Sequence, residues 1–319
     1  AMLQIYTYQW SETLFILETL IFIIAYYKYL QPHRIKTLIV VAVVAAIGCI
    51  TRYAGVTLIG TGGLLILIDN VLKPKRKITH LLIFGLIAAS LLAGNLILNT
   101  LSTGLSTGTR EPSITPFTEN LYYFGTVILD WAGLPDTLNP LAIVFGSFVF
   151  LGLIGLLAWK ALSRRLNSYE NIIIAFALVY GLFIVLSATF SRFERINSRL
   201  ISPLFIPLLL SFTFWVPNLI RHIKFNKKWL LATPFIIAML AFEYTIAKVD
   251  WQRYDDQYEY GIPGYTDDDW NKSDFVIFLK THPHIFKSGY PIYSDANEAV
   301  YIFTRLHSEL LPHKFFPKT

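Results

Sequence analysis

Residues 170–190 read ENIIIAFALVYGLFIVLSATF, an almost continuous apolar run of membrane-crossing length. A helix needs about 20 apolar residues to span the roughly 30 Å hydrocarbon core of a bilayer. A lone extended segment is excluded, because its unpaired backbone groups would lie in lipid. The run therefore predicts a transmembrane helix.

Seven further runs of this kind predict an all-α polytopic membrane protein with about eight transmembrane helices. They lie at roughly 11–30, 35–50, 54–72, 78–98, 140–162, 200–219 and 229–247. Composition agrees, since 54% of the residues are hydrophobic and 15% are charged, whereas soluble domains carry roughly 25% charged residues. Residues 1–247 are thus expected to form a transmembrane helical domain, with an outer loop at about 99–139.

Basic residues predict the orientation of these helices, because most of them fall in alternate connections. The groups are Lys28, Arg34 and Lys36; Lys73, Lys75, Arg76 and Lys77; Lys160, Arg164 and Arg165; and Arg221, Lys224, Lys227 and Lys228. Short loops rich in Lys and Arg stay in the cytoplasm. The formal charge of +6 therefore indicates contact with anionic membrane lipid and not with nucleic acid. We expect an integral protein of a bacterial plasma membrane, with an extracytoplasmic C-terminus.

Residues 248–319 differ in character and predict a small extracytoplasmic α/β tail. Acidic residues become frequent and the apolar runs shorten. The sequence predicts a helix at about 270–279, a short strand at 290–294, and a second helix capped by Asp295 with Glu298 as its partner.

The outer loop divides into two parts. Residues 100–120 are rich in Ser, Thr, Gly and Pro, so this part is expected to be mobile and to close over a site. Residues 121–131 carry apolar side chains at helical spacing, which predicts a helix lying at the membrane interface.

Five arginines lie at the outer ends of the predicted spans, where topology does not require them. They are Arg52, Arg110, Arg192, Arg195 and Arg199. The guanidinium group suits bidentate recognition of phosphate. We therefore expect Arg199, Arg195, Arg52 and Arg192 to bind a lipid-linked phosphate. In the alternative interpretation, Glu194 pairs with one arginine and the others reach lipid phosphates.

Acidic residues near the first span are weaker candidates. Glu12 could pair with Arg52, orient a catalytic group, contact a sugar hydroxyl, or favour the helix dipole. Glu18 lies deeper in the same span and is expected to face a polar cavity. The sequence has no HExxH motif and no Cys/His spacing typical of zinc sites, and it has no P-loop. No metal ligand is assigned, and the catalytic residues stay unknown, with Glu12 as a weak candidate.

Four segments carry a resemblance to a known family. They are WSETLF (10–15), TRYAG (51–55), RINSRLISPL (195–204) and YPIYSDANEAVY (290–301). Together they resemble the GT-C superfamily of membrane glycosyltransferases, in particular the protein O-mannosyltransferases and aminoarabinose transferases.

This resemblance implies a reaction. Such enzymes transfer a sugar from a polyprenyl-phosphate donor to an acceptor glycan, lipid or protein on the outer face of the membrane. They are metal-assisted or metal-independent inverting enzymes, so the resemblance leaves open whether a divalent metal is a cofactor. The catalytic aspartate of the family lies in the first outer loop, and the resemblance leads us to expect that this sequence begins after that loop. The chain is thus expected to be a C-terminal portion of such an enzyme.

Two other interpretations stay open. One is a non-enzymatic transporter of lipid-linked saccharides or a membrane assembly subunit. The other is an O-antigen-type polymerase or ligase, which acts on a polyprenyl pyrophosphate. A transporter is expected to carry charges near the bilayer midplane. Here the charges gather at the outer rim, which favours chemistry at a lipid headgroup.

Overall fold

The protein is almost entirely helical, as the apolar runs predict. The computed structural model describes residues 11–107, 112–191, 194–222, 228–260, 268–282, 284 and 290–311. Helix accounts for 80% of the structure. The chain divides into two compact units, Ala1–Ile236 and Ile237–Thr319. Among the predicted site residues, Arg110 and Arg192 lie outside the described ranges.

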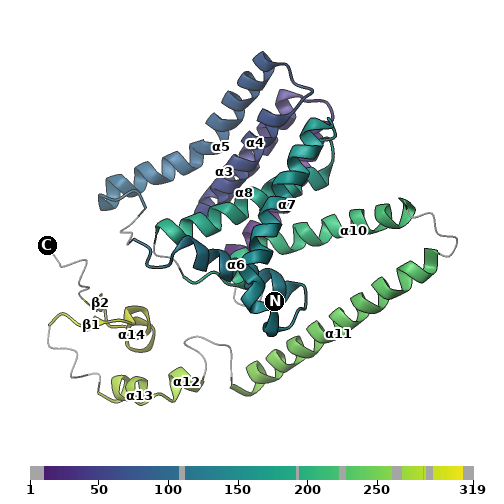
Figure 1. The fold of residues 1–319 in the computed structure, drawn as a ribbon. Coiled ribbons are helices and arrows are strands. Elements are labelled where there is room, and N and C mark those ends of the chain that lie inside the picture. The colour runs from purple at the N-terminus through teal and green to yellow at the C-terminus, as the bar shows by residue number, and fades with distance from the viewer. Residues whose placement is uncertain are drawn as a thin grey trace. The chain divides into compact units, whose positions relative to one another are not determined.

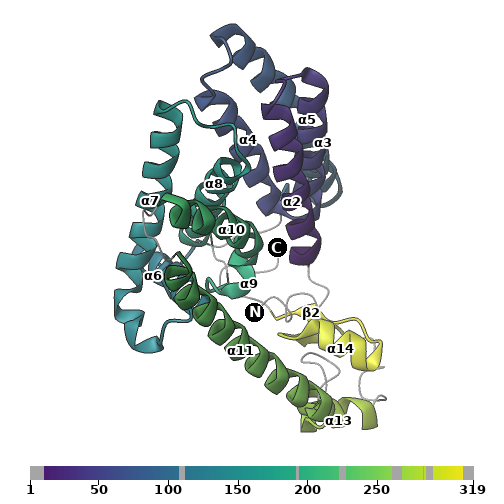
Figure 2. The ribbon, with the colours of Figure 1, turned by 90° about the vertical axis from the view of Figure 1, so that its right-hand side faces the viewer.

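The first unit is a helical bundle built around one central helix (Figure 1). Its elements are α2 (Ser11–Leu30), α3 (Ile35–Thr51), η1 (Tyr53–Gly55), α4 (Val56–Ile68), α5 (Pro74–Thr103), α6 (Phe117–Trp131), η2 (Asp136–Leu141), α7 (Ala142–Leu162), α8 (Tyr169–Phe190), α9 (Ser198–Ile201), η3 (Ser202–Leu204) and α10 (Phe205–His222). Helix α8 contacts α2 and α4 on one side and α6 and α7 on the other (Figure 2). The run that predicts the fold therefore forms the centre of the bundle.

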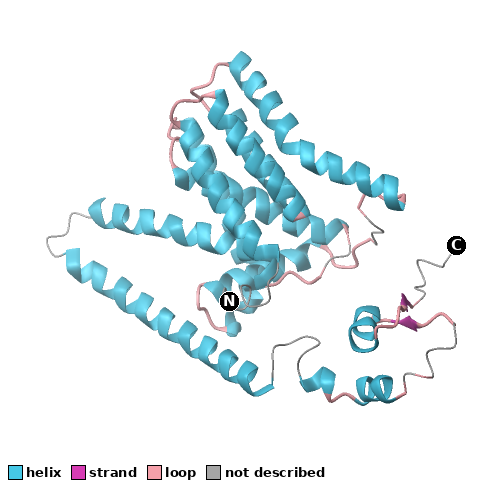
Figure 3. Cartoon of the chain, turned by 180° about the vertical axis from the view of Figure 1, so that it is seen from behind, coloured by secondary structure: helices cyan, strands magenta, loops and turns pink. Residues whose placement is uncertain are grey.

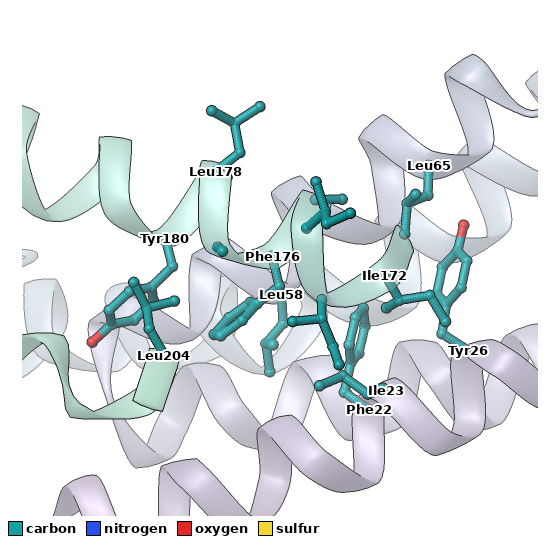
Figure 4. Close-up of a cluster of buried hydrophobic side chains, with 14 of the residues drawn as sticks. Phe22, Ile23, Tyr26, Leu58, Leu65, Ile172, Phe176, Leu178, Tyr180 and Leu204 are labelled. Atoms are coloured by element: carbon teal, nitrogen blue, oxygen red, sulfur yellow. The ribbon is translucent and has the colours of Figure 1, made fainter. Parts of the chain in front are cut away.

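The core forms where α2, α4 and α8 meet. Figure 4 shows the side chains that fill this contact, namely Phe22, Ile23, Tyr26, Leu58, Leu65, Ile172, Phe176 and Tyr180. Helix α8 is apolar on all faces, and a helix of that kind is stable only when it is enclosed by protein or lipid. The bundle thus accounts for its continuous apolar sequence.

Among the described residues, four helices are long and apolar enough to cross a membrane. They are Ser11–Leu30, Pro74–Thr103, Asp136–Leu162 and Tyr169–Phe190. Burial differs between these helices. In the most apolar part of Tyr169–Phe190, 61% of the residues are buried, whereas in the most apolar part of Pro74–Thr103 only 11% are buried. An apolar helix that exposes most of its surface is expected to contact lipid, so the chain is an α-helical integral membrane protein.

Three shorter apolar helices correspond to other predicted spans. They cover Ile35–Thr51, Tyr53–Ile68 and Ser198–Thr213. The eighth predicted span falls within α11 (Lys228–Tyr260). The number of eight spans therefore stays a prediction.

The connection between α3 and α4 is as tight as the sequence predicts. Helix α3 ends at Thr51, and Arg52 adopts an extended conformation before η1 begins at Tyr53. A Cβ atom on Gly55 would lie 2.2 Å from the carbonyl oxygen of Gly48. The two helix ends can approach this closely only because residue 55 has no side chain, and this approach sets the position of Arg52.

Residues 100–120, expected to form a mobile lid, contain helical residues at both ends of the segment, and their mobility stays a prediction. Helix α5 continues through Thr103 and ends at Gly104, whose φ of +77° suits glycine. Ser113 Oγ donates a hydrogen bond of 2.6 Å to the carbonyl oxygen of Ala188. Pro112 forms an antiparallel bridge with Ser191. These two contacts join Pro112 and Ser113 to the end of α8, and residues 108–111 lie outside the description.

The helix predicted at 121–131 is confirmed, and it begins earlier, at Phe117.

The second unit holds most of α11, from Ile237 onward, and the small tail (Figure 3). The tail contains α12 (Asp268–Asn271), α13 (Asp274–Thr281), β1 (Tyr293–Ser294), α14 (Asn297–Thr304) and β2 (Glu309–Leu310). Strands β1 and β2 pair in parallel. The predicted cap at Asp295 is wrong, because α14 begins at Asn297 after Ala296, whose N–H bonds Ser294 Oγ at 3.0 Å.

Candidate anion-binding site

One buried carboxylate joins two arginines that are distant in the sequence. Glu12, the second residue of α2, is only 3% exposed. Its Oε1 forms an ion pair with Nη1 of Arg52 and lies 3.2 Å from Nε of Arg199. The Glu12–Arg52 pairing that the sequence suggested is confirmed. The start of α2, the end of α3 and the short helix α9 therefore meet at this point.

A second carboxylate binds the other end of the Arg199 guanidinium. Glu194 Oε2 lies 2.7 Å from Nη2 of Arg199. Glu194 Oε1 accepts a hydrogen bond of 2.6 Å from the side-chain amide of Asn197. The side chain of Glu194 is 42% exposed. The pairing of Glu194 with one of the arginines, which is one part of the alternative interpretation, is thus confirmed.

Local hydrogen bonds fix the short helix that carries Arg199. Asn197 caps α9, because its Oδ1 accepts from the backbone N–H of Leu200 at 3.1 Å. Ser202 Oγ donates to the carbonyl oxygen of Arg199 at 2.6 Å. Tyr180 of α8 donates to the carbonyl oxygen of Leu200 at 2.8 Å. Asn197 and Ser202 from the same segment, and Tyr180 from the central helix α8, therefore fix the backbone around Arg199.

Glu18 anchors the backbone next to Arg52. Thr51 Oγ1 donates a hydrogen bond of 2.7 Å to Glu18 Oε1. Glu18 is 6% exposed, and its other carboxylate oxygen has no hydrogen-bond partner within the described part of the chain. The sequence predicts a polar cavity around Glu18, whereas the structure places it against Thr51. This contact links α2 to the end of α3, one residue before Arg52 leaves the helix.

Arg195 is bound elsewhere, on α6. Its guanidinium lies over the ring of Tyr123, with 4.1 Å between Cζ and the ring centroid. The Tyr123 hydroxyl donates a hydrogen bond of 2.5 Å to Glu119 Oε1. This hydrogen bond raises the pKa of Tyr123 above its ordinary value, because ionisation would remove the donor. The structure thus brings Arg52 and Arg199 together on Glu12 and gives Arg195 a separate partner.

Sequence reasoning missed the contacts made by Asn197 and by the pair Tyr123 and Glu119, although both contacts had local signals. Asn197 precedes α9 as a typical N-cap residue, and its amide also fixes Glu194. Tyr123 and Glu119 are four residues apart on one helix, a spacing at which side chains meet.

The charges of the site determine its chemistry. Both guanidiniums carry a permanent positive charge, and each contacts a carboxylate in this structure. Arg52 and Arg199 keep solvent access, with 14% and 32% of their side chains exposed. Within the described residues, no group of three or more His, Cys, Asp or Glu side chains could hold a metal ion. The arrangement is suited to binding an anion that replaces or joins the carboxylates.

Comparison with known proteins assigns the chain to no family. No protein-family model matches it, and no curated protein and no solved structure matches it significantly. The function is therefore argued from the site and from the sequence resemblance.

Proposed function

We propose that this chain is the donor-binding part of a GT-C-type membrane glycosyltransferase. The enzyme would transfer a sugar from a polyprenyl-phosphate donor to an acceptor on the outer face of the membrane. One observation carries the proposal: Arg52 and Arg199 converge on the buried Glu12 where apolar helices begin and end.

The position of these charges supports a lipid-linked substrate. Residues at the ends of membrane-spanning helices lie near the level of lipid headgroups. Arg52 and Arg199 lie at the end that the distribution of basic loops assigns to the outer side. A polyprenyl phosphate keeps its chain in the bilayer and its phosphate at this level. This orientation makes the tail from about residue 248 extracytoplasmic. We also propose that the membrane is a bacterial plasma membrane.

The proposed mechanism uses the two guanidiniums as electrostatic catalysts. The acceptor hydroxyl attacks the anomeric carbon as the bond from this carbon to the phosphate oxygen breaks. Negative charge then grows on the departing polyprenyl phosphate, and Arg52 and Arg199 stabilise it. A base must take the proton of the acceptor hydroxyl. Because Glu12 is bound to both arginines, we assign it the role of their anchor and place the base outside this cluster.

Two rival functions use the same kind of site. A transporter or assembly subunit for lipid-linked saccharides would bind the donor without cleaving it. An O-antigen-type polymerase or ligase would bind a pyrophosphate. Donor binding tests the site, and turnover separates the enzyme from the transporter.

The test is binding of a polyprenyl-phosphate sugar to the purified chain in a phosphate-free detergent. A charge-assisted hydrogen bond contributes roughly 1.5–3 kcal/mol, so Arg199→Ala should weaken binding by roughly ten- to a hundredfold. Arg199→Lys should recover only part of the affinity, since the planar fork is lost. The matched control is Arg76→Ala, which removes an exposed arginine at the opposite, predicted cytoplasmic end.

Unchanged affinity in Arg199→Ala, with an unchanged thermal unfolding midpoint, would contradict the donor site. Equal losses in Arg199→Ala and Arg76→Ala would show that binding depends only on total charge. Donor binding without sugar transfer, measured with any upstream portion of the protein present, would favour the transporter.

A further inference from the structure

A small cavity lies where two connections of the first unit meet. It has a volume of about 250 Å³ and is lined by Asp69, Asn70, Val71, Arg164, Leu166 and Asn167. The first three residues follow α4 and the last three follow α7. The side-chain amide of Asn70 donates a hydrogen bond to the carbonyl oxygen of Ala161 near the end of α7. This bond joins the two connections that form the walls of the cavity.

Asp69 forms a firmly held acidic wall of this cavity, and it is only 2% exposed. Its Oδ1 accepts hydrogen bonds from the backbone N–H groups of Val71 and Leu72, at 2.7 and 3.3 Å. Its Oδ2 lies 2.7 Å from Nε2 of His33. A carboxylate offers about four acceptor positions, and these contacts use three of them. One position on Oδ2 is therefore left for a further donor.

Arg164 brings a positive charge to the same cavity. Two other basic side chains nearby have partners within the fold. Lys77 Nζ donates to the carbonyl oxygen of Leu67 at 2.7 Å, and Lys160 Nζ lies 3.2 Å from Glu170 Oε1. Among the residues that the structure describes, none forms a hydrogen bond or ion pair with the exposed guanidinium of Arg164. A guanidinium is suited to bind a phosphate through two parallel hydrogen bonds.

The backbone of Arg164 is in a conformation that is unusual for an arginine. Its φ is +54°, in the left-handed region that glycine adopts most easily. The N–H of Arg164 is bonded to the carbonyl oxygen of Ala161 at 3.1 Å, so the turn itself holds this conformation. Because strain of this kind is tolerated most often at functional positions, it supports a role for the side chain beyond stability.

We infer that this cavity binds the headgroup of a phospholipid that carries both a phosphodiester and a primary ammonium group, as phosphatidylethanolamine does. Arg164 binds the phosphate, and Oδ2 of Asp69 accepts a hydrogen bond from the ammonium group. Solvent alone could satisfy an exposed guanidinium, but a guanidinium and a buried carboxylate lining one cavity match a ligand with charges of both signs.

The position of the cavity suits a membrane lipid. The ends of apolar helices lie near the level of lipid headgroups on either orientation of the chain. Val71 in the cavity wall and Leu162 at the end of α7 are both exposed and offer apolar surface to acyl chains. The 13 residues of α4 separate the cavity from the connection that holds Arg52, a distance of about 20 Å. The lipid site is therefore independent of the proposed donor site.

The test compares phosphatidylethanolamine, phosphatidylcholine and phosphatidylglycerol with identical acyl chains. Each lipid is added to the purified chain in detergent, and bound lipid is measured by native mass spectrometry. Phosphatidylethanolamine should bind about fivefold more tightly than phosphatidylcholine, whose methylated ammonium cannot donate a hydrogen bond to Asp69. It should also bind more tightly than phosphatidylglycerol, which has no ammonium group.

A variant of Arg164 tests the phosphate contact without endangering the fold. Arg164→Gly removes the guanidinium and suits the left-handed backbone, so the thermal unfolding midpoint should not fall. Affinity for phosphatidylethanolamine should fall by about tenfold, as expected for the loss of a hydrogen bond to a charged group. The matched control Arg165→Ala removes the adjacent exposed arginine, which lies outside the cavity lining, and should change affinity by less than about twofold.

A soluble headgroup distinguishes a membrane lipid from a free metabolite. Glycerophosphoethanolamine carries the same charges without acyl chains and should bind at least about tenfold more weakly than the lipid. Equal binding of the two would overturn the assignment to a membrane lipid.

Three further outcomes would overturn the inference. The first is unchanged phosphatidylethanolamine binding by Arg164→Gly. The second is binding of phosphatidylcholine or phosphatidylglycerol as tightly as phosphatidylethanolamine, since Asp69 would then have no part in recognition. The third is an equal loss in Arg164→Gly and Arg165→Ala, which would mean that binding follows total charge. Arg199→Ala should leave phosphatidylethanolamine binding unchanged, so a failure of this site is distinguishable from a failure of the donor site.

Discussion

Two arginines of one segment, Arg199 and Arg195, are four residues apart and have different surroundings. Arg199 joins the buried Glu12 and the exposed Glu194. Arg195 lies on the ring of Tyr123, which is bonded to the exposed Glu119. Both clusters contain a guanidinium and a carboxylate, which form an ion pair in the first cluster and contact opposite parts of Tyr123 in the second. They differ because Glu12 starts an apolar helix inside the bundle, whereas Glu119 lies on the outside of α6.

This difference in burial predicts a difference in role. A buried carboxylate can hold two guanidiniums in fixed positions with little competition from water, and the site of Arg199 is organised before any ligand arrives. The cluster of Arg195 is open to solvent, and its contacts brace the segment against α6. The two clusters are therefore expected to respond differently when each one loses its carboxylate, its guanidinium or its proton.

The largest expected effect is on stability when Glu12 loses its charge. Glu12→Gln leaves Arg52 and Arg199 without their shared buried partner and should lower the free energy of unfolding by about 3 kcal/mol. The measurement is thermal or denaturant unfolding in detergent. Glu119→Gln, the same change in the exposed cluster, should cost less than about 1 kcal/mol. Equal costs would mean that burial does not distinguish the two clusters.

A smaller effect is expected when Arg195 is removed. A cation–π contact at an exposed site contributes roughly 0.5–1 kcal/mol, so Arg195→Ala should lower stability by no more than this amount. Donor affinity should fall by less than about threefold, well below the loss expected for Arg199→Ala. The measurement is the same binding assay as for Arg199. An equal loss in both variants would show that the two clusters act as one binding site.

The smallest effect is a dependence of stability on pH in the exposed cluster. The hydrogen bond to Glu119 raises the pKa of Tyr123 in the folded protein. A raised pKa means that this hydrogen bond stabilises the fold fully below the ordinary tyrosine pKa, near 10, and is lost as pH rises through the folded value. Thermal unfolding midpoints from pH 8 to 11 should therefore fall less steeply in Tyr123→Phe. Tyr122→Phe is the matched control and should keep the original slope.

Much of the fold follows from the sequence, because helix formation in an apolar run depends on neighbouring residues. The run at 170–190 predicts α8 within one residue of its observed bounds, Tyr169–Phe190. The spacing in 121–131 likewise predicts α6. Backbone hydrogen bonds of a helix close within four residues, and lipid or protein must cover the apolar side chains in either case. These features need no knowledge of distant contacts.

The sequence also indicated which residues are candidates for function, since the distribution of basic loops does not account for these arginines. It could not determine which of them meet. The pairing of Arg52 with Arg199 through Glu12 depends on three chain segments arriving at one point. It requires the close approach of Gly55 to Gly48 and the anchoring of α9 by Tyr180. Those contacts join residues far apart in the chain.

The remaining features were decided by tertiary structure for the same reason. Ser113 donates a hydrogen bond to the carbonyl group of Ala188, 75 residues away, and the local content of Ser, Thr, Gly and Pro does not predict this contact. On sequence grounds Arg195 could have joined Arg199 or contacted α6, and the structure places it over Tyr123 of α6. Local hydrogen bonding and hydrophobicity determine which segments are helices. Only the packing of those helices determines which charges share a site, because a charge pair forms between whichever side chains the packed backbone brings within a few ångströms.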